Sequence, residues 1–411
     1  MLLDTFVKVA TTKPRYEVAD VFRRYGAAYR RQYPVSWEQH KAMRDIVNCR
    51  TAALGGYVEE CDTCGRLRIS YCSCKNRNCP KCGGFEKAQW LARQEVKLLP
   101  IPYFHVVFTT DHLINDLARV NREEVYNLLF HTAAQVLKTF AHKYLGGEIG
   151  FTVILHTWSQ TLTEHIHLHC MVTGGAWQQT KGGPRWQASA PGFLFPIVQL
   201  SREFRDRFCA GLLRLQRKGR LQLVGQVAGL DVGDLVKKMR SKRWEVFVKP
   251  APGDPRSLCD YLGKYTYRIA ISNHRIVSIE RGQVRFTYHD NRDGGQEKVM
   301  ELPALEFMRR FLLHVLPARF VRIRHYGLHH SSKRGELEQC RALLGLPQAL
   351  PEAPELILSE WVQSVVGVDL RRCPFCGEGR MFVRSEFAPV PPWKGTVLSW
   401  LGIPYRGAVV A

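Results

Sequence analysis

Three histidines alternate with aliphatic residues in the segment His165-Ile166-His167-Leu168-His169. Successive side chains of a β-strand point to opposite faces, so we expect the three imidazoles on one face and the aliphatic side chains in a core. Imidazoles that share a face can bind a divalent metal ion. The alternative is a polar sheet face that carries histidines only for solubility.

The segment that precedes these histidines brings two further candidates to the same face. If residues 161–164 form a tight hairpin, Gln160 lies opposite His165. In the same register His156 lies opposite His169. The predicted site therefore gains a carboxamide oxygen and another imidazole.

A downstream segment, DYLGKYTYRIAISNHRI, contains tyrosines flanked by cations. Tyr261 and Tyr265 are four residues apart and share one face of a helix, whereas Tyr267 points elsewhere. A tyrosine oxygen beside a metal-bound phosphodiester can attack phosphorus, form a 5′-phosphotyrosine and release a 3′-hydroxyl. Because a phenol has a pKa of about 10, the metal or the neighbouring Lys264 and Arg268 must favour its ionised form. Ordinary helix packing is the alternative.

Six of the 13 cysteines fall between Cys61 and Cys82, a density that indicates metal binding in a reducing compartment. Cys61-Asp-Thr-Cys64 and Cys79-Pro-Lys-Cys82 are two CxxC knuckles. Two such turns complete the tetrahedral thiolate shell that Zn²⁺ prefers, so we predict that the two knuckles bind one structural zinc ion. Buried free thiols or a redox pair are the alternatives.

Two further cysteines lie between these knuckles. Either Cys72 or Cys74 can replace a knuckle cysteine or join Cys49 or His40 in a second site. Basic residues of the same loop suit contacts with phosphates. The predicted zinc ligands are Cys61, Cys64, Cys74, Cys79 and Cys82, and the predicted DNA contacts are Lys75, Arg77, Lys81, Lys264 and Arg268.

Another knuckle, Cys373-Pro-Phe-Cys376, lies near the C-terminal end and carries less information by itself. Two interpretations of this knuckle remain: it is part of a second zinc site, or it is a pair of thiols that bind no metal. The additional ligands would be Cys340 and one of His325, His329 or His330.

The elements that must position these residues follow from the hydrophobic periodicity. Residues 180–192 are rich in Gly and Pro and are expected to form a loop. The segment 277–290 is expected to form a hairpin. Helices are predicted at 17–33, 36–52, 85–100, 114–143, 200–217 and 257–270, and strands at 104–110, 151–160, 165–174 and 244–250.

The charge balance points to a polyanionic partner. The 411 residues include 59 Lys and Arg against 37 Asp and Glu, a formal net charge of +22, which attracts nucleic acid. A hydrophobic content of 45% excludes a disordered basic tail as the main feature. Because no stretch is long and apolar enough to span a membrane and the start lacks the features of a signal peptide, we expect a cytoplasmic protein.

Taken together, these motifs resemble those of the two-tyrosine HUH endonucleases, and in detail the IS91-type rolling-circle transposases. The segments that carry the resemblance are CKNRNCPKCGG, LHTWSQTLTEHIHLHCMVTGGA, YLGKYTYRIAISNHRI and VRFTYHD, which occur in the order of that family. The resemblance covers residues from about Cys61 to Arg334.

The resemblance implies an α+β fold with a central antiparallel sheet flanked by helices. It also implies that His167 and His169 bind Mg²⁺ or Mn²⁺, that Gln160 is the third ligand, and that His165 and His156 lie around them. Three domains are expected: a helical and zinc-binding DNA-binding domain (1–95), an HUH catalytic domain (96–335) and an accessory region (336–411).

The implied function is transposition. Tyr261 and Tyr265 would cleave and rejoin single-stranded DNA at insertion-sequence ends and at the target, in a bacterial cytoplasm where the protein associates with the nucleoid. Three alternatives remain open. They are a plasmid replication initiator or relaxase with the same chemistry, a zinc-dependent DNA-binding protein without catalysis, and a histidine-triad hydrolase, which needs neither tyrosine.

Overall fold

The chain forms two compact units, each built from separated stretches of sequence. The computed structural model describes residues 14–251, 257, 261, 263, 269–290 and 293–390. We call residues 1–90, 269–315 and 355–411 the cysteine unit, and residues 91–268 and 316–354 the histidine unit. These units are discontinuous in sequence, whereas the three expected domains are continuous segments, so that division stays a prediction.

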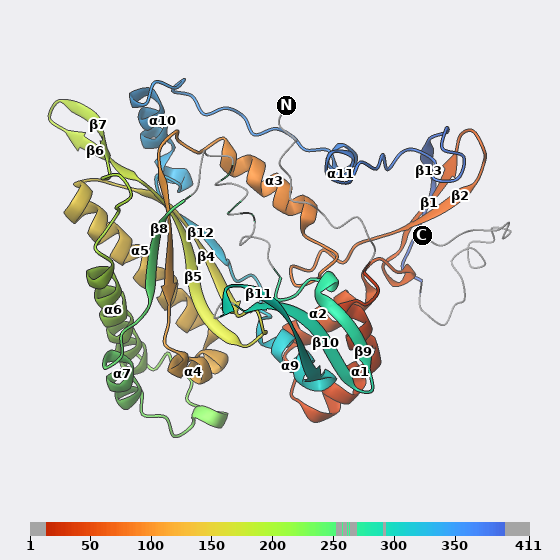
Figure 1. Ribbon diagram of the computed structural model, residues 1–411, viewed down its shortest axis with the longest axis horizontal. Coiled ribbons are helices and arrows are strands. Elements are labelled where there is room, and N and C mark those ends of the chain that lie inside the picture. The colour runs from red at the N-terminus through yellow and green to blue at the C-terminus, as the bar shows by residue number, and fades with distance from the viewer. Residues whose placement is uncertain are drawn as a thin grey trace. The chain divides into compact units, whose positions relative to one another are not determined.

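Five antiparallel strands form the central sheet of the histidine unit, in the order β12–β4–β5–β3–β8 (Figure 1). The expected α+β fold is confirmed, and the four strands predicted here are all present. Their bounds are β3 (Tyr103–Thr109), β4 (Gly150–Trp158), β5 (Glu164–Thr173), β8 (Val246–Pro250) and β12 (Ile323–Gly327).

One face of this sheet packs against helices and forms the largest core of the chain. Phe108 of β3 and Leu168 of β5 are buried there with Phe130 and Phe204 of the covering helices. The rings of Phe108 and Phe204 lie 4.6 Å apart. Because side chains alternate along each strand, the opposite face is left for polar residues. The helices of this unit that the structure describes from end to end include α4 (Asn115–Val120), α5 (Arg122–Leu145), α6 (Ile197–Arg217), α7 (Val232–Arg240) and α10 (Arg334–Leu343).

Two details differ from the sequence prediction. The helix expected over 114–143 is divided at Asn121, whose side-chain amide donates to the carbonyls of Leu117 and Gln222. The loop predicted over 180–192 is wrong in its first part, because β6 (Gly175–Thr180) and β7 (Gly183–Ala188) form a hairpin. Trp177 and Trp186 face each other across this hairpin, and such aromatic cross-strand pairs stabilise it.

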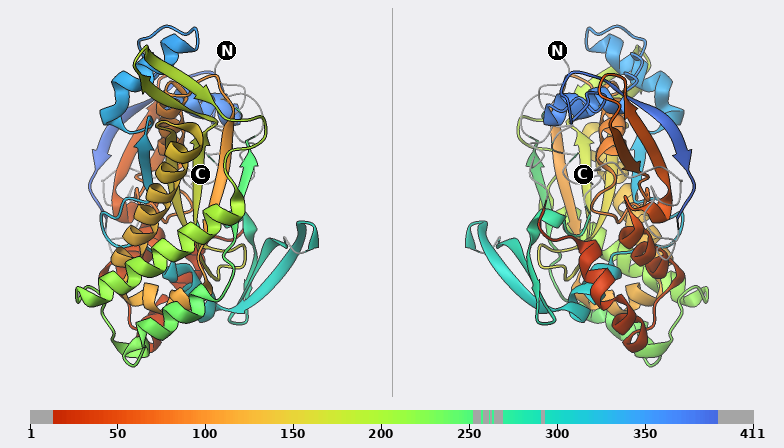
Figure 2. Two further views of the ribbon diagram at one scale, coloured as in Figure 1. Left: turned by 90° about the vertical axis from the view of Figure 1, so that its left-hand side faces the viewer. Right: turned by 90° about the vertical axis from the view of Figure 1, so that its right-hand side faces the viewer.

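The cysteine unit combines helices with two small antiparallel sheets. Helix α2 begins at a capping box, in which the Ser36 hydroxyl and the Gln39 side chain each accept a hydrogen bond from the other residue's backbone amide. The sheets have the orders β13–β1–β2 and β11–β10–β9. The second is teal in Figure 2 and contains the predicted hairpin. The elements are α1 (Val18–Gln32), α2 (Trp37–Asn48), β1 (Gly56–Cys61), β2 (Leu67–Tyr71), β9 (Ile276–Glu280), β10 (Gln283–Asp290), β11 (Gln296–Pro303), α9 (Ala304–Leu313), α11 (Leu358–Val366) and β13 (Met381–Phe387).

Two further expectations concern single helices. The helix predicted over 85–100 is present as α3 (Gly84–Glu95), whereas most of the one predicted over 257–270 lies outside the described residues. Within the described part of the chain, every helix is too short or too polar to traverse a lipid bilayer.

Candidate active site and metal centres

Three imidazoles meet on the polar face of the histidine unit's sheet. One ring nitrogen from each of His156, His167 and His169 lies within 4.8 Å of the others. His156 on β4 pairs directly with His167 on β5. His156 and His167 are buried. The predicted alternation is confirmed for His167 and His169, since Ile166 and Leu168 lie in the core on the other face, whereas exposed His165 is not part of this group. We call His156, His167 and His169 the histidine cluster.

Hydrogen bonds fix how these rings are turned. The Nδ1 atom of His167 lies 2.7 Å from the carbonyl oxygen of His165, so it donates its proton there and leaves Nε2 free of hydrogen. The Nε2 atoms of His167 and His169 lie 3.1 Å apart. Two nitrogen ligands about 2.1 Å from one ion are separated by about 3.0–3.4 Å at angles of 90–110°. The cluster therefore fits a divalent metal ion.

His105 on β3 was not among the sequence candidates, although it extends this cluster. Its Nε2 lies 2.9 Å from Nδ1 of His169, and its Nδ1 lies 2.7 Å from the hydroxyl of Tyr261. Burial, reinforced by Lys249, lowers the pKa of His105 to about 4, so the ring is neutral at neutral pH. Alternation in the strand segment FHVVFTT could have indicated His105, because it places His105 on the same sheet face as Val107. In the structure Val107 pairs with His169, so this face is the one that carries the histidine cluster.

Tyr261 is helical and half-buried, and it lies at the end of this hydrogen-bonded series. Its ring meets that of His105 edge to face at 5.1 Å. The sequence thus led to one tyrosine that the structure brings to the histidines. Tyr265, Lys264 and Arg268 lie outside the described residues.

Gln160 lies in the turn between β4 and β5 rather than opposite His165. The predicted register is wrong by two residues, because Trp158 already pairs with Glu164 and the turn takes the five residues between them. Hydroxyl groups hold this turn: Ser159 Oγ lies 3.0 Å from Thr161 Oγ1. A slip of two residues keeps the same face, so His156 meets His167 instead of His169. A metal contact of Gln160 stays a prediction.

Four cysteines of the N-terminal region form one compact cluster. Cys49, Cys74, Cys79 and Cys82 place their sulfur atoms within 4.8 Å of one another. The sulfur of Cys82 lies 3.5 Å from that of Cys49 and 3.7 Å from that of Cys74. Sulfur ligands about 2.3 Å from a tetrahedral Zn²⁺ lie about 3.8 Å apart, so this cluster fits zinc.

The two predicted knuckles do not share an ion, which corrects the sequence prediction. Cys61 and Cys64 lie instead beside the C-terminal knuckle, Cys373 and Cys376. The additional zinc ligands predicted to join Cys373 and Cys376 are also wrong. Cys340 is buried with Leu99, Leu328 and Leu337. His325 and His329 both share hydrogen bonds with Thr152.

The basic residues expected to contact DNA have different surroundings. Lys75 is exposed. Lys81 forms an ion pair of 2.5 Å with Glu17, and burial lowers the pKa of Arg77. Residues 309–334 form another basic segment, which we also expected to contact DNA. One of its cations, Arg324, lies 4.1 Å from the centre of the Phe130 ring and therefore packs against an aromatic side chain.

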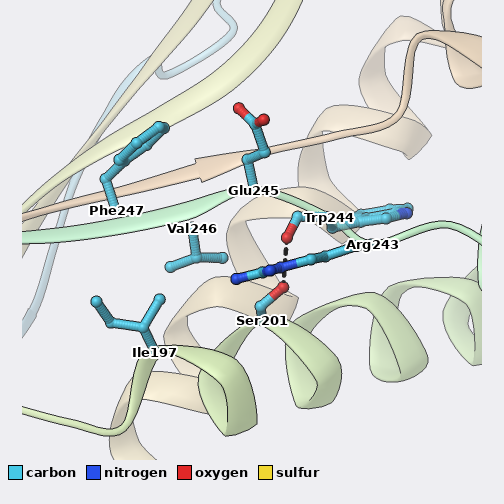
Figure 3. A pocket seen from close by; sticks show the side chains of 7 residues that line it. All are labelled: Ile197, Ser201, Arg243, Trp244, Glu245, Val246 and Phe247. Atoms are coloured by element: carbon cyan, nitrogen blue, oxygen red, sulfur yellow. Dashed lines mark hydrogen bonds between the residues drawn. The ribbon is translucent and has the colours of Figure 1, made fainter.

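A shallow hollow lies beside the edge strand β8 (Figure 3). The Ser201 hydroxyl of α6 donates to the carbonyl of Trp244 over 2.6 Å at its base. Phe247 points to the side of the strand opposite Val246, and 48% of its surface is exposed. An adjoining hollow is lined by the cations Arg202, Arg205, Lys242 and Arg243.

Two family models match the chain. Residues 21–110 match a family described as "Transposase zinc-binding domain", and residues 150–336 match one described as "Putative transposase". The first contains Cys49, Cys74, Cys79 and Cys82, and the second contains the histidine cluster and Tyr261.

Two curated proteins are similar over most of their length. The chain is 44% identical to "Putative transposase y4qJ" of Sinorhizobium fredii over 389 residues, which is 92% of this chain and 97% of the relative. It is 26% identical to the transposase for insertion sequence element IS801 of Pseudomonas savastanoi pv. phaseolicola over 348 residues, or 83% and 82%. No solved structure matches significantly.

Proposed function

The chain belongs to the IS91 family of transposases, and we propose that it cleaves and rejoins single-stranded DNA through a phosphotyrosine intermediate. The proposal depends mainly on two contacts that link the histidine cluster to Tyr261. Nδ1 of His169 lies 2.9 Å from Nε2 of His105, and Nδ1 of His105 lies 2.7 Å from the hydroxyl of Tyr261. These contacts support the proposal because they link the predicted nucleophile, Tyr261, to the histidines predicted to bind the metal ion.

The reaction exchanges one ester for another. The oxygen of Tyr261 attacks the scissile phosphorus, the bond from phosphorus to the 3′ oxygen breaks, and the DNA 5′ end becomes joined to the tyrosine. The phenol loses one proton and the released 3′ oxygen gains one, so no water or nucleotide is consumed. Rejoining is the reverse attack by a 3′-hydroxyl.

Mg²⁺ or Mn²⁺, held by His167, His169 and either His156 or Gln160, would polarise the scissile phosphate. If His169 offers Nε2 to the ion, its Nδ1 keeps a proton and donates to Nε2 of His105. Nδ1 of neutral His105 then carries a proton and donates to the oxygen of Tyr261. A donor at this position favours the ionised phenol that attacks phosphorus.

The other parts of the proposal concern DNA handling. Tyr265 would act on the second strand end or on the target, so that insertion-sequence ends are transferred without hydrolysis. Zinc in the cluster of Cys49, Cys74, Cys79 and Cys82 would shape the loop that carries the exposed Lys75, which would contact phosphates.

Denaturing gels test this function directly. Labelled single-stranded oligonucleotides that tile the DNA flanking the gene are incubated with the full chain and Mn²⁺. We expect a covalent adduct from the parent and from the control Tyr144→Phe, whose tyrosine lies on α5. The double variant Tyr261→Phe, Tyr265→Phe should form none. Equal adduct from the double variant would exclude the proposed mechanism.

A further inference from the structure

The structure brings together two cysteine knuckles from opposite ends of the chain. The sulfur of Cys61 lies 3.8 Å from that of Cys376, and the sulfur of Cys64 lies 3.8 Å from that of Cys373. All four sulfur atoms lie within 4.8 Å of one another. We propose that these four thiolates bind a second structural Zn²⁺, separate from the ion of the N-terminal cluster, which joins the C-terminal region to the zinc-binding domain. We call it the closing site.

The sulfur separations favour a metal ion over disulfides. Bonded sulfur atoms are about 2.05 Å apart, whereas thiolates about 2.3 Å from a tetrahedral zinc are about 3.8 Å apart. The observed 3.8 Å agrees with the second value for both pairs. An all-sulfur tetrahedral donor set is typical of Zn²⁺ and excludes the hard ions Mg²⁺ and Ca²⁺.

The backbone around the sulfurs has the form of two matched zinc knuckles. Both sequences read CxxCG, and Gly65 and Gly377 have φ angles of +65° and +73°. Their amides donate to the carbonyls of Cys61 and Cys373, each over 3.0 Å. Glycine adopts this left-handed conformation without strain, which lets the chain turn sharply after the second sulfur.

Backbone amides also point at the sulfur atoms. The amide of Cys64 donates to the sulfur of Cys61 over 3.5 Å. The amides of Phe375 and Gly379 donate to the sulfurs of Cys373 and Cys376 over 3.4 Å each. Hydrogen bonds to sulfur favour the thiolate, the form that binds zinc.

The surrounding contacts bring the two knuckles close together. Strand β13 pairs with β1 so that Met381 faces Cys61. The amide of Arg380 donates to Oδ1 of Asp62 over 2.8 Å. A Cβ atom at Gly379 would lie only 2.5 Å from the sulfur of Cys61, so the close approach requires glycine there.

Zinc content per chain tests the closing site. The background is the full chain with His167→Ala and His169→Ala, so that the histidine cluster adds no zinc. After purification with a thiol reductant, we expect two zinc ions per chain by mass spectrometry of the metal. Cys373→Ser with Cys376→Ser should leave one, Cys79→Ser with Cys82→Ser should also leave one, and the control Cys209→Ala should keep two.

A second measurement needs no cysteine variant. The zinc-loaded background protein is alkylated with and without a chelator, and the modified cysteines are identified by peptide mass spectrometry. We expect Cys61, Cys64, Cys373 and Cys376 to be protected with zinc and to become reactive together when it is removed. One zinc per chain, two ions in the Cys373, Cys376 variant, or alkylation of these cysteines despite zinc would overturn the proposal.

Discussion

A single neutral imidazole connects the proposed nucleophile to the histidine cluster. His105 has two ring nitrogens, and each already has a partner, His169 on one side and Tyr261 on the other. A neutral imidazole donates from one nitrogen and accepts at the other, so the proton position on His169 determines whether His105 offers a donor to the tyrosine. We therefore expect His105 to be a positioning residue that acts through Tyr261.

We predict that His105→Ala slows adduct formation about 100-fold, because the tyrosine oxygen loses its donor. The pKa of His105 is lowered to about 4, so the parent ring is neutral from pH 5 upward and its contribution stays constant there. In the variant, ionisation of the phenol is unassisted, so its rate should rise more steeply than the parent's between pH 7 and 9.

The control for this prediction is His131→Ala, which changes an exposed histidine of α5. Rates are compared at saturating Mn²⁺, because loss of the hydrogen bond between His169 and His105 should itself weaken Mn²⁺ binding about 10- to 100-fold, measured by electron paramagnetic resonance. A rate reduced equally at every pH would show that His105 has only a structural role.

Which residues of the site could be predicted depended on whether their signal was local. Alternation along one strand placed His167 and His169 on one face. The partner of Cys61 was not predictable from spacing, because Cys376 lies 315 residues away and the nearer of the two other CxxCG knuckles, at Cys79, offers the same pattern. His105 was missed because one histidine in an apolar strand has no pattern of its own.

At the scale of elements, the edge strand β8 extends the sheet face that carries the histidine cluster. Val107 pairs with His169 on one side and with Phe247 on the other, so these three side chains lie in one row across the sheet. Figure 3 shows Glu245 and Phe247 on the side of β8 opposite Val246. An exposed aromatic ring two strands from the histidines, with Arg243 nearby, suits stacking of a DNA base.

We predict that Phe247→Ala weakens binding of single-stranded DNA about 5- to 100-fold, the range of one lost base stack. Arg243→Ala should weaken binding and reduce the slope of log affinity against log salt concentration by about one. Fluorescence anisotropy at salt concentrations of about 50 to 200 mM measures both effects. Arg217→Ala, at the far end of α6, is the matched control. If all three variants bind as the parent does, the DNA does not cross β8.

Most elements followed from periodicity, but their junctions did not. The turn after β4 was predicted one residue too short, with four residues instead of five, because Leu162 is buried at a φ of +62°, a conformation that propensities disfavour. The β6–β7 hairpin was hidden by its Gly and Pro content, although the pairing of Trp177 with Trp186 stabilises it. Both differences arise from side-chain contacts that the sequence pattern does not show.

At the scale of the whole molecule, the two kinds of candidate metal site lie in different units. The histidine cluster belongs to the histidine unit, whose sheet rests on a large core, and both cysteine clusters belong to the cysteine unit. In the β13–β1–β2 sheet, by contrast, the buried core consists of Val58, Phe387 and Val390. A core this small supplies little hydrophobic free energy, so we expect zinc bound by the cysteines to supply a larger share of the stability there.

We therefore predict that zinc removal unfolds the chain unequally. Chelation under reducing conditions should speed amide hydrogen exchange in residues 49–82 and 373–387, because ligand turns held by metal lose their main stabilising contact. Strands β3, β4 and β5 should stay protected, since Phe108, Val153 and Leu168 remain buried without metal. Restoring Zn²⁺ should restore protection, whereas Mg²⁺ should not, because thiolates bind it poorly. Equal loss of protection in both units would contradict this division, because it would mean that the large core of the histidine unit also depends on the cysteine-bound ions.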